Sequence, residues 1–169
     1  AFNIANSEFV SALIKTAERE NSPAILQIHP NEINLMGDEF AAYCVQAAHR
    51  VSVPIVIHLD HGRDLNDVVR AIRNGFTSVM IDASHLPIDE NIEIVQKVKT
   101  LADRYGADVE AEVGQLAGSE DGSEGKKVLY SDPDDVEKMY EKTHVCAIAL
   151  SIGNSHGFYK EEPRLNFNV

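Results

Sequence analysis

Short apolar segments rich in β-branched residues alternate with amphipathic segments along the whole chain. The apolar segments predict strands over residues 1–5, 24–29, 53–60, 77–83, 108–113 and 146–152. The amphipathic segments predict helices over residues 8–21, 37–50, 65–74, 89–105 and about 132–142. Strands that alternate with helices in one direction indicate an α/β protein with a parallel sheet.

Two parallel architectures compete for this pattern, an open doubly wound sheet and a (β/α)8 barrel. No G-x-G-x-x-G motif follows the first predicted strand, so the best sequence evidence for a dinucleotide-binding sheet is missing. Polar residues instead follow the third to sixth strands, at Asp60, His61, Asp82, Glu112 and His156. Functional residues at the carboxyl ends of several strands are typical of a (β/α)8 TIM barrel, which needs eight strands and about 250 residues. Residues 1–169 are therefore predicted to form a single barrel domain, roughly the first six strands of an incomplete barrel without its C-terminal strands 7 and 8.

The first predicted helix has an expected cap and an expected buried stripe. Ser7 is the expected N-cap of the helix over residues 8–21. The stripe expected to face the sheet consists of Phe9, Ala12, Leu13, Thr16 and Ala17.

The composition excludes some partners. A net charge of −12 argues against a nucleic-acid binder and against binding to an anionic membrane. It is compatible with a phosphorylated substrate, because a metal ion and backbone amides can bind phosphate locally. No apolar run approaches the roughly 20 residues that a membrane span needs. Cys44 and Cys146 lack motif spacing, so they are expected to be buried thiols of a protein in the reducing cytoplasm.

The stretch from His58 to Gly62 ends the third predicted strand with two imidazoles and a carboxylate. These groups are suitable ligands for a metal such as zinc, and a carboxylate beside the metal can transfer protons. Strand alternation places His58 and Asp60 on one face and His61 on the other, so the chain must bend after Asp60, and Gly62 permits that bend. The alternative for this stretch alone is a strand end with a cluster of surface charges.

The segment over residues 116–131 is rich in glycine, serine and glutamate and is the one irregular region of the pattern. It follows the fifth strand and therefore lies on the face where a barrel has its active site. Two interpretations remain open: a solvated surface loop, or a lid that brings Glu120 over a bound substrate.

Six motifs in order along the chain resemble the class II, metal-dependent ketose-bisphosphate aldolases, a family that includes fructose- and tagatose-bisphosphate aldolases. The motifs are Ala1-Phe2-Asn3, the stretch over residues 58–62, the stretch over residues 75–87, the stretch over residues 109–114, Tyr130-Ser131-Asp132-Pro133 and the stretch over residues 152–157. Any one of them is weak evidence, whereas the ordered set is specific to the family.

The resemblance implies a zinc ion, or another divalent metal, held by His61 and His156. The family's third histidine ligand follows the seventh strand and has no counterpart in residues 1–169. Asp82 and Glu112 match positions that hold a second or displaced metal in relatives, and they could equally orient His61 and raise its basicity. For the remaining histidines, His29, His49, His85 and His144, structural or surface roles are expected.

The resemblance also implies roles in catalysis and substrate binding. Asp60 matches the catalytic aspartate and Glu120 the glutamate of a mobile loop, while Asn3, Gly157 and Lys160 match positions around the substrate and a monovalent cation. The implied reaction cleaves a ketose (bis)phosphate into dihydroxyacetone phosphate and an aldehyde through a zinc-stabilised enediolate, in a cytoplasmic homo-oligomer.

Three points stay open at this stage. His29 stands where fructose-bisphosphate enzymes tend to carry a small hydroxyl residue near a phosphate, so the sugar is not defined. Another zinc-dependent barrel enzyme, such as a hydrolase, would have similar strand ends. A truncated, non-catalytic homologue would lack the third ligand.

Overall fold

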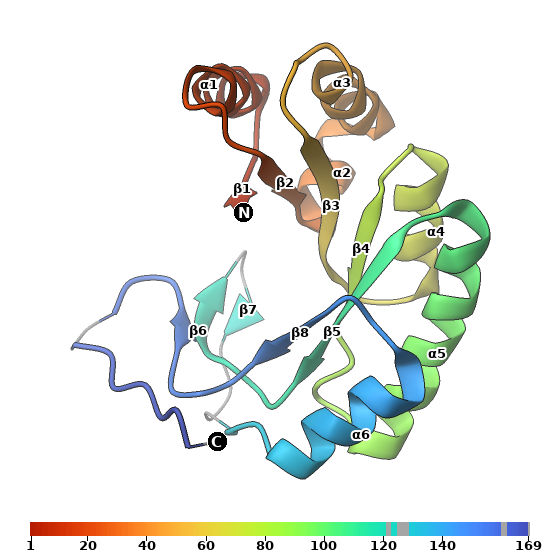
Figure 1. Ribbon diagram of the computed structural model, residues 1–169, viewed down its shortest axis with the longest axis vertical. Helices are drawn as coiled ribbons and strands as arrows, with labels where there is room; N and C mark the ends of the chain where they lie inside the picture. The colour runs from red at the N-terminus through yellow and green to blue at the C-terminus, as the bar shows by residue number, and fades with distance from the viewer. Residues whose placement is uncertain (121–122, 125–128, 160–161, 169) are drawn as a thin grey trace.

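The centre of the fold is a six-stranded sheet in which all neighbouring strands are parallel and follow the order of the sequence. The computed structural model describes residues 1–120, 123–124, 129–159 and 162–168, with the backbone alone described for residues 117–120 and 123–124. The sheet contains β1 (Phe2–Asn3), β2 (Ala24–Ile28), β3 (Ile55–Gly62), β4 (Ser78–Ile81), β5 (Asp108–Val113) and β8 (Ala147–Leu150). Figure 1 shows that it curves into a half-barrel with helices along its outer side. The strand order never reverses, as it does in a doubly wound sheet, so the prediction of a partial TIM barrel is confirmed.

Six helices accompany these strands: α1 (Ser7–Arg19), α2 (Pro30–Met36), α3 (Asp38–Ala48), α4 (Leu65–Arg73), α5 (Ile88–Tyr105) and α6 (Pro133–Thr143). Helix α2 was not predicted. His29 is its N-cap, where the ring Nδ1 accepts a hydrogen bond from the Asn31 N–H at 3.2 Å, and Pro30 occupies the first turn. A proline at that position loses no helical hydrogen bond, so the His29-Pro30 pair begins a helix at the end of β2. None of the helices within the described residues is both long and apolar enough to cross a lipid bilayer.

One prediction about α1 is wrong and another is only partly right, since Ala17 is buried and Leu13 packs against the core as expected. The N-cap is Asn6 and not Ser7, because the Asn6 side chain accepts a hydrogen bond from the Phe9 N–H at 2.9 Å. The buried residues are Val10, Ile14 and Ala17, whereas Phe9 is 51% exposed. Val10, Ile14 and Ala17 stand at positions i, i+4 and i+7 and therefore form a single face.

The hydrophobic core lies between the outer face of the sheet and the helices. On β5, Val109 and Ala111 are fully buried and Val113 is nearly so, and all three belong to a core cluster with Val95, Val98 and Ala102 of α5. The sheet is thus held in shape by apolar packing on one face, and the other face does not take part in this core.

A second, three-stranded sheet, in the order β7-β6-β9, lies across the open side of the half-barrel (Figure 1). It contains β6 (Ala117–Glu120), β7 (Ser123–Glu124) and β9 (Ser155–His156). Part of the segment predicted to be irregular is therefore strand, since β6 pairs antiparallel with β7 and in parallel with the distant strand β9.

One cysteine also differs from expectation. Cys44 is buried as predicted, but Cys146 is exposed, since it enters the edge strand β8.

Candidate active site

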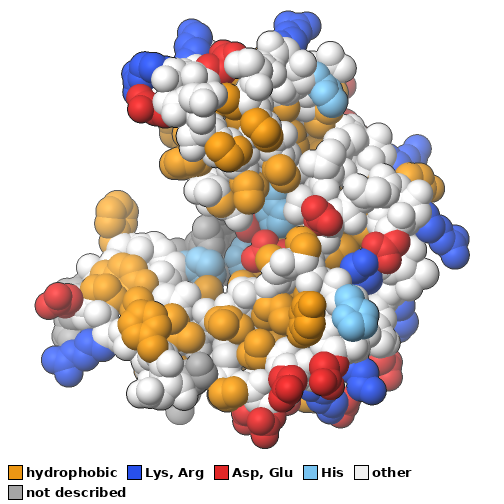
Figure 2. Space-filling model, viewed as in Figure 1, with side chains coloured by type: hydrophobic (Ala, Val, Ile, Leu, Met, Phe, Trp, Pro, Cys, Tyr) orange, Lys and Arg blue, Asp and Glu red, His pale blue; other side chains and the backbone are white. Residues whose placement is uncertain are grey.

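The polar residues predicted at the strand ends lie on the inner side of the half-barrel. Figure 2 shows a hollow between the N-terminal and C-terminal parts of the surface, with histidine and acidic side chains at its base. Asp60 and His61 come from the end of β3, Asp82 follows β4, Glu112 lies in β5 and His156 in β9. Parallel strands place these ends at one edge of the sheet, as the sequence predicted.

His61 reaches the site because of an irregularity in β3. The register with β4 shifts between Leu59 and Gly62, and His61 adopts a left-handed backbone with φ of 46°. The bend was predicted to depend on the flexibility of Gly62, but the residue with positive φ is His61 itself. A non-glycine residue in this region is strained, and such strain is most often found at functional sites.

Gly62 has a different role, because it permits close packing. A Cβ atom at this position would lie 2.6 Å from the Met80 carbonyl oxygen and 2.9 Å from the Leu59 side chain. Only glycine therefore allows β3 to approach β4 immediately after His61.

His61, Asp82 and Glu112 form a compact group whose possible ligand atoms all lie within 4.8 Å of one another. The His61 Nδ1 is 3.1 Å from Asp82 Oδ2 and 4.0 Å from Glu112 Oε2. The Glu112 side chain is 4% exposed, and its Oε2 is buried without a hydrogen-bond partner. Imidazole and carboxylate groups in this arrangement are a suitable donor set for a divalent cation, which would also satisfy the buried Glu112 oxygen.

The electrostatics of this group also favour a cation. Burial alone would lower the pKa of His61, but the hydrogen bond to Asp82 and the charges of Asp60, Asp82 and Glu112 raise it to about 9. Burial, followed by the charge of Asp82, raises the pKa of Glu112 to about 7. Burial opposes ionisation of Asp82 too, but the hydrogen bonds from His61 and Ser84 lower its pKa to about 2. His61 and Glu112 therefore hold protons near neutral pH, because the negative charge of the site is not otherwise neutralised. A bound metal ion would replace these protons and neutralise that charge.

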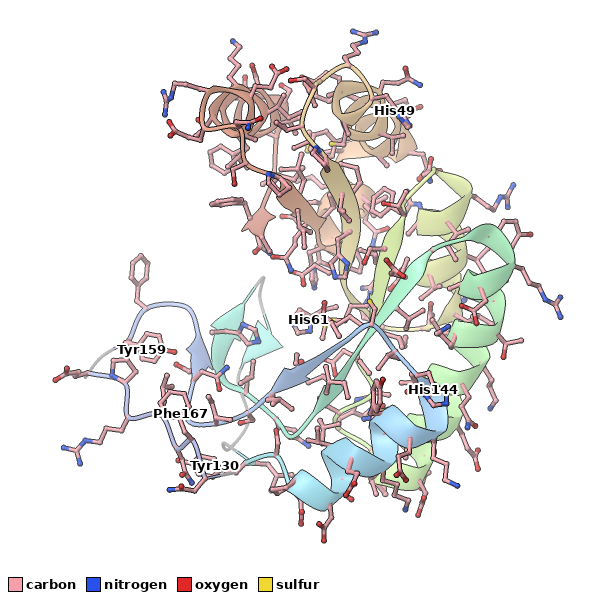
Figure 3. The ribbon with its side chains drawn as sticks, in the orientation of Figure 1. His49, His61, Tyr130, His144, Tyr159 and Phe167 are labelled. Carbon is pink, nitrogen blue, oxygen red and sulfur yellow. The ribbon has the colours of Figure 1, made fainter. Side chains whose placement is uncertain are left out.

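His156 lies next to His61, although the two residues are far apart in the sequence. Their ring centroids are 5.3 Å apart and the ring planes make an angle of 75°. The two rings are thus close enough to contact one bound ion, which is the proximity that the family resemblance implied. Figure 3 shows His61 on the inner side of the half-barrel, whereas His49 and His144 lie among the outer helices.

Asp60 is 5% exposed and is held by two amide side chains. Asn3 Nδ2 donates to its Oδ2 at 2.7 Å, and Gln27 Nε2 donates to its Oδ1 at 3.2 Å. Asn3 was predicted to contact the substrate, and in this structure its side chain binds Asp60. Gln27 was missed, although a lone polar residue inside the apolar strand β2 is a signal that could have identified it.

A second polar group lies two residues before Asp60 on the same inner face, as strand alternation predicted for His58. His58 is 3% exposed, and its Nδ1 is 2.7 Å from the Ser78 hydroxyl oxygen. Its Nε2 is 3.5 Å from Glu110 Oε2. Burial lowers the pKa of His58 to about 4, so the ring is neutral at neutral pH and this contact is not an ion pair.

Three predicted site residues remain, and the structure describes them to different extents: Gly157, Glu120 and Lys160. Gly157 follows His156 directly and has a φ of 77°, which glycine tolerates best. Glu120 is the last residue of β6, and its side chain is outside the described part of the structure. Lys160 lies outside the described residues altogether, so its role remains a prediction.

The fold and the site together define a half-barrel with a candidate metal site at its strand ends, and the comparison of sequences identifies the family. A sequence model of the class-II fructose-bisphosphate aldolases matches residues 1–169, so the chain belongs to this family. It is 41% identical over 170 residues to the "Probable fructose-bisphosphate aldolase" of Bacillus subtilis, covering 98% of this chain and 60% of that protein. The fructose-bisphosphate aldolase of Staphylococcus epidermidis is 39% identical, with 98% of this chain and 59% of that protein covered.

Solved structures agree with the assignment. The YdjI aldolase of Escherichia coli K12 superposes with a TM-score of 0.85 at 32% identity, over 99% of this chain and 59% of that one. A putative fructose-1,6-biphosphate aldolase of Coccidioides immitis gives a TM-score of 0.90 at 30% identity, over 98% of this chain and 60% of that one. The chain thus spans about three fifths of the length of the relatives that it matches.

Proposed function

We propose that the protein is a metal-dependent aldolase that cleaves the C3–C4 bond of a ketose bisphosphate to give dihydroxyacetone phosphate and an aldehyde. The observation that carries the proposal is the convergence of His61, His156, Asp82 and Glu112 beside a separately held carboxylate, Asp60. Membership of the class-II fructose-bisphosphate aldolase family supports it independently.

In this proposal His61 and His156 hold a divalent cation, with zinc as the candidate. Asp82 either joins them as a ligand or orients the His61 ring through Nδ1, and the 3.1 Å contact is compatible with both roles. Glu112 contributes a buried carboxylate oxygen that otherwise has no hydrogen-bond partner. A bound cation of this kind supplies Lewis-acid stabilisation of the negative charge that develops on the substrate as the bond breaks.

Asp60 is proposed as the general base. Its carboxylate would take the proton from the C4 hydroxyl during cleavage and return it during condensation. Asn3 and Gln27 each donate a hydrogen bond to it, one to each carboxylate oxygen. They also fix its orientation, so that little reorganisation is needed when the substrate binds.

The other roles are proposed from the resemblance. Glu120 would exchange the C3 proton, while Gly157 and Lys160 would lie near the substrate and a monovalent cation. Residues 1–169 are proposed to belong to a single barrel domain, since six strands lie in one sheet. A homo-oligomer and a cytoplasmic location complete the proposal, and sedimentation and cell fractionation test them.

The function is tested by incubating the purified protein with ketose bisphosphates and measuring the release of triose phosphate. We expect activity that a chelator abolishes and that zinc or cobalt restores. His61→Ala and His156→Ala should each lose the metal and the activity, while His49→Ala, an exposed histidine at the end of α3, should retain both.

Other results would contradict the proposal in distinct ways. Chelator-resistant activity would exclude the metal mechanism. Release of an acid product would indicate a hydrolase, and tight metal binding without turnover of any ketose phosphate would indicate a non-catalytic homologue.

A further inference from the structure

Two serines, Ser131 and Ser151, are buried behind the candidate active site, with exposed fractions of 3% and 0%. Ser131 lies two residues before α6, in the Tyr130-Ser131-Asp132-Pro133 motif, and Ser151 directly follows β8. Neither belongs to the group of possible metal ligands. Buried hydroxyl groups are retained when their hydrogen bonds are satisfied, so the partners of these serines indicate their role.

The partners join three separate segments of backbone. The Ser131 hydroxyl donates to the Val113 carbonyl at 2.6 Å and accepts from the Ser151 N–H at 2.8 Å. The Ser131 N–H donates to the Ser151 carbonyl at 2.9 Å, and the Ser151 hydroxyl donates to the Gln115 carbonyl at 3.1 Å. We call this set of four hydrogen bonds the serine clasp. It holds the carboxyl ends of β5 and β8 together and ties both to the segment that precedes α6.

The space around the clasp is closely filled. Gly114 lies between two clasp residues, Val113 at the end of β5 and Gln115 just after it, and has a φ of 88°. A Cβ atom there would lie 2.8 Å from the Ser131 hydroxyl oxygen and 2.9 Å from the Ser151 Cβ. Because a side chain at Gly114 would displace the clasp residues, the close packing at this position helps to fix the relative position of the two strand ends.

Both strand ends lead directly to proposed metal-site residues. Glu112 is two residues before Gly114, and its carbonyl accepts a hydrogen bond from the buried Asn91 side chain at 2.8 Å. On the other side, the chain leaves Ser151 and reaches His156 in β9. Strand β9 pairs with β6, with Gly118 opposite His156, and β6 starts two residues after the clasp residue Gln115. The clasp is therefore the shared base of the strands that carry Glu112, His156 and Glu120.

We propose that Ser131 and Ser151 are positioning residues that set the distance between His156 and the cluster of His61, Asp82 and Glu112. The inference rests on the proposed function in so far as these residues hold a metal. Removing the Ser131 hydroxyl leaves the Val113 carbonyl and the Ser151 N–H without their buried partner, so the two strand ends separate or admit water. His156 then moves relative to His61, and the site loses metal affinity while the outer core stays packed.

The test compares Ser131→Ala, Ser131→Thr and Ser151→Ala with a matched control, Thr143→Val. The Thr143 hydroxyl is also buried and donates to a backbone carbonyl, that of Met139 at 2.6 Å, but it lies at the far end of α6. Two measurements are made on each variant: Co²⁺ affinity and visible spectrum by competition with a chelator, and hydrogen exchange of the backbone amides in β6 and β9.

We expect Ser131→Ala to lower Co²⁺ affinity about 10-fold, to change the Co²⁺ spectrum and to speed amide exchange in β9. Ser151→Ala should give a smaller change of the same kind, because it removes the bond to Gln115 alone. Ser131→Thr keeps the hydroxyl and should restore affinity and spectrum, and Thr143→Val should lower thermal stability without changing either.

Wild-type Co²⁺ affinity and wild-type exchange in β9 of Ser131→Ala would overturn the inference, as would equal effects of Thr143→Val. If the wild-type protein binds no Co²⁺, the proposed metal function fails. The exchange data then decide the positioning role on their own. Faster amide exchange in β9 of Ser131→Ala, with unchanged exchange around Thr143, supports the role. Exchange that is altered equally in both regions refutes it.

Discussion

The two faces of the same strands have different chemistry. On β5, Val109, Ala111 and Val113 face the helices and belong to the core, whereas Glu110 and Glu112 lie on the inner side, near histidines of β3. On β3, Leu59 is fully buried in the core between His58 and Asp60, which bind polar partners. An ordinary barrel fills its interior with branched apolar side chains. Here the apolar residues of each strand pack in the core, and the polar residues that alternate with them line the proposed active site.

The comparison predicts that neighbouring residues on one strand can be altered with separate consequences. At neutral pH, substitution of an inner-face residue of the proposed active site, such as Asp60, should affect turnover or metal binding and leave the free energy of unfolding nearly unchanged. An outer-face substitution should do the reverse.

The largest effect is expected for Asp60→Ala. Loss of the proposed general base should lower kcat by about 1,000-fold or more, which corresponds to about 4 kcal/mol of transition-state stabilisation. Metal content and thermal unfolding should stay close to wild type, as checked by atomic absorption and calorimetry. Retention of more than about a tenth of the activity would remove Asp60 from the mechanism.

Substitution of the adjacent residue, Leu59→Ala, should lower stability and leave metal binding nearly unchanged. It removes a fully buried side chain from the core and should lower the free energy of unfolding by about 3 kcal/mol in urea titration. Metal affinity at a temperature where the variant is folded should change little. A large loss of metal affinity with little loss of stability would show that the two faces are not separable.

His58 should make stability depend on pH. Its pKa is about 4 in the folded protein and 6.5 in a solvated reference, so between these values the unfolded chain binds more protons than the folded one. Folding is therefore weakened as the pH falls from about 6.5 to about 4, by at most about 3 kcal/mol from this residue. Urea titrations from pH 7.5 to pH 4 should show a shallower decline for His58→Asn, which does not titrate, and identical slopes would contradict the assignment.

The smallest effect is expected for Gln27→Met. The substitution keeps side-chain length but removes the hydrogen bond to Asp60 Oδ1, so kcat should fall about 10-fold with KM and metal content nearly unchanged. Val79→Ala, on the outer face of β4, serves as a control for a small change in packing. A KM effect without a kcat effect would place Gln27 in substrate binding instead.

Much of the fold followed from local chemistry. The strands predicted over residues 24–29, 53–60 and 108–113 depend on the apolar residues of each segment, and the structure has a strand at each place: β2, β3 and β5. The convergence of Asp60, His61, Asp82 and Glu112 also followed, because parallel strands bring their carboxyl ends together.

The features that could not be predicted from the sequence depend on contacts between residues that are far apart along the chain. Strand β6 exists because it pairs with β9, and no local pattern shows that pairing. The left-handed backbone of His61 occurs where Gly62 approaches the Met80 carbonyl closely, and that approach is a tertiary contact. Gln27 was overlooked because the rest of its strand is apolar and its hydrogen-bond partner, Asp60, lies on the neighbouring strand β3.

The central claim is that His61 and His156 hold one divalent cation beside Asp60. Anomalous diffraction at the zinc edge from crystals grown with zinc tests it most directly. The account predicts one strong peak about 2.1 Å from an imidazole nitrogen of each ring. A zinc ion bound elsewhere, or bound without contact to either ring, would contradict it.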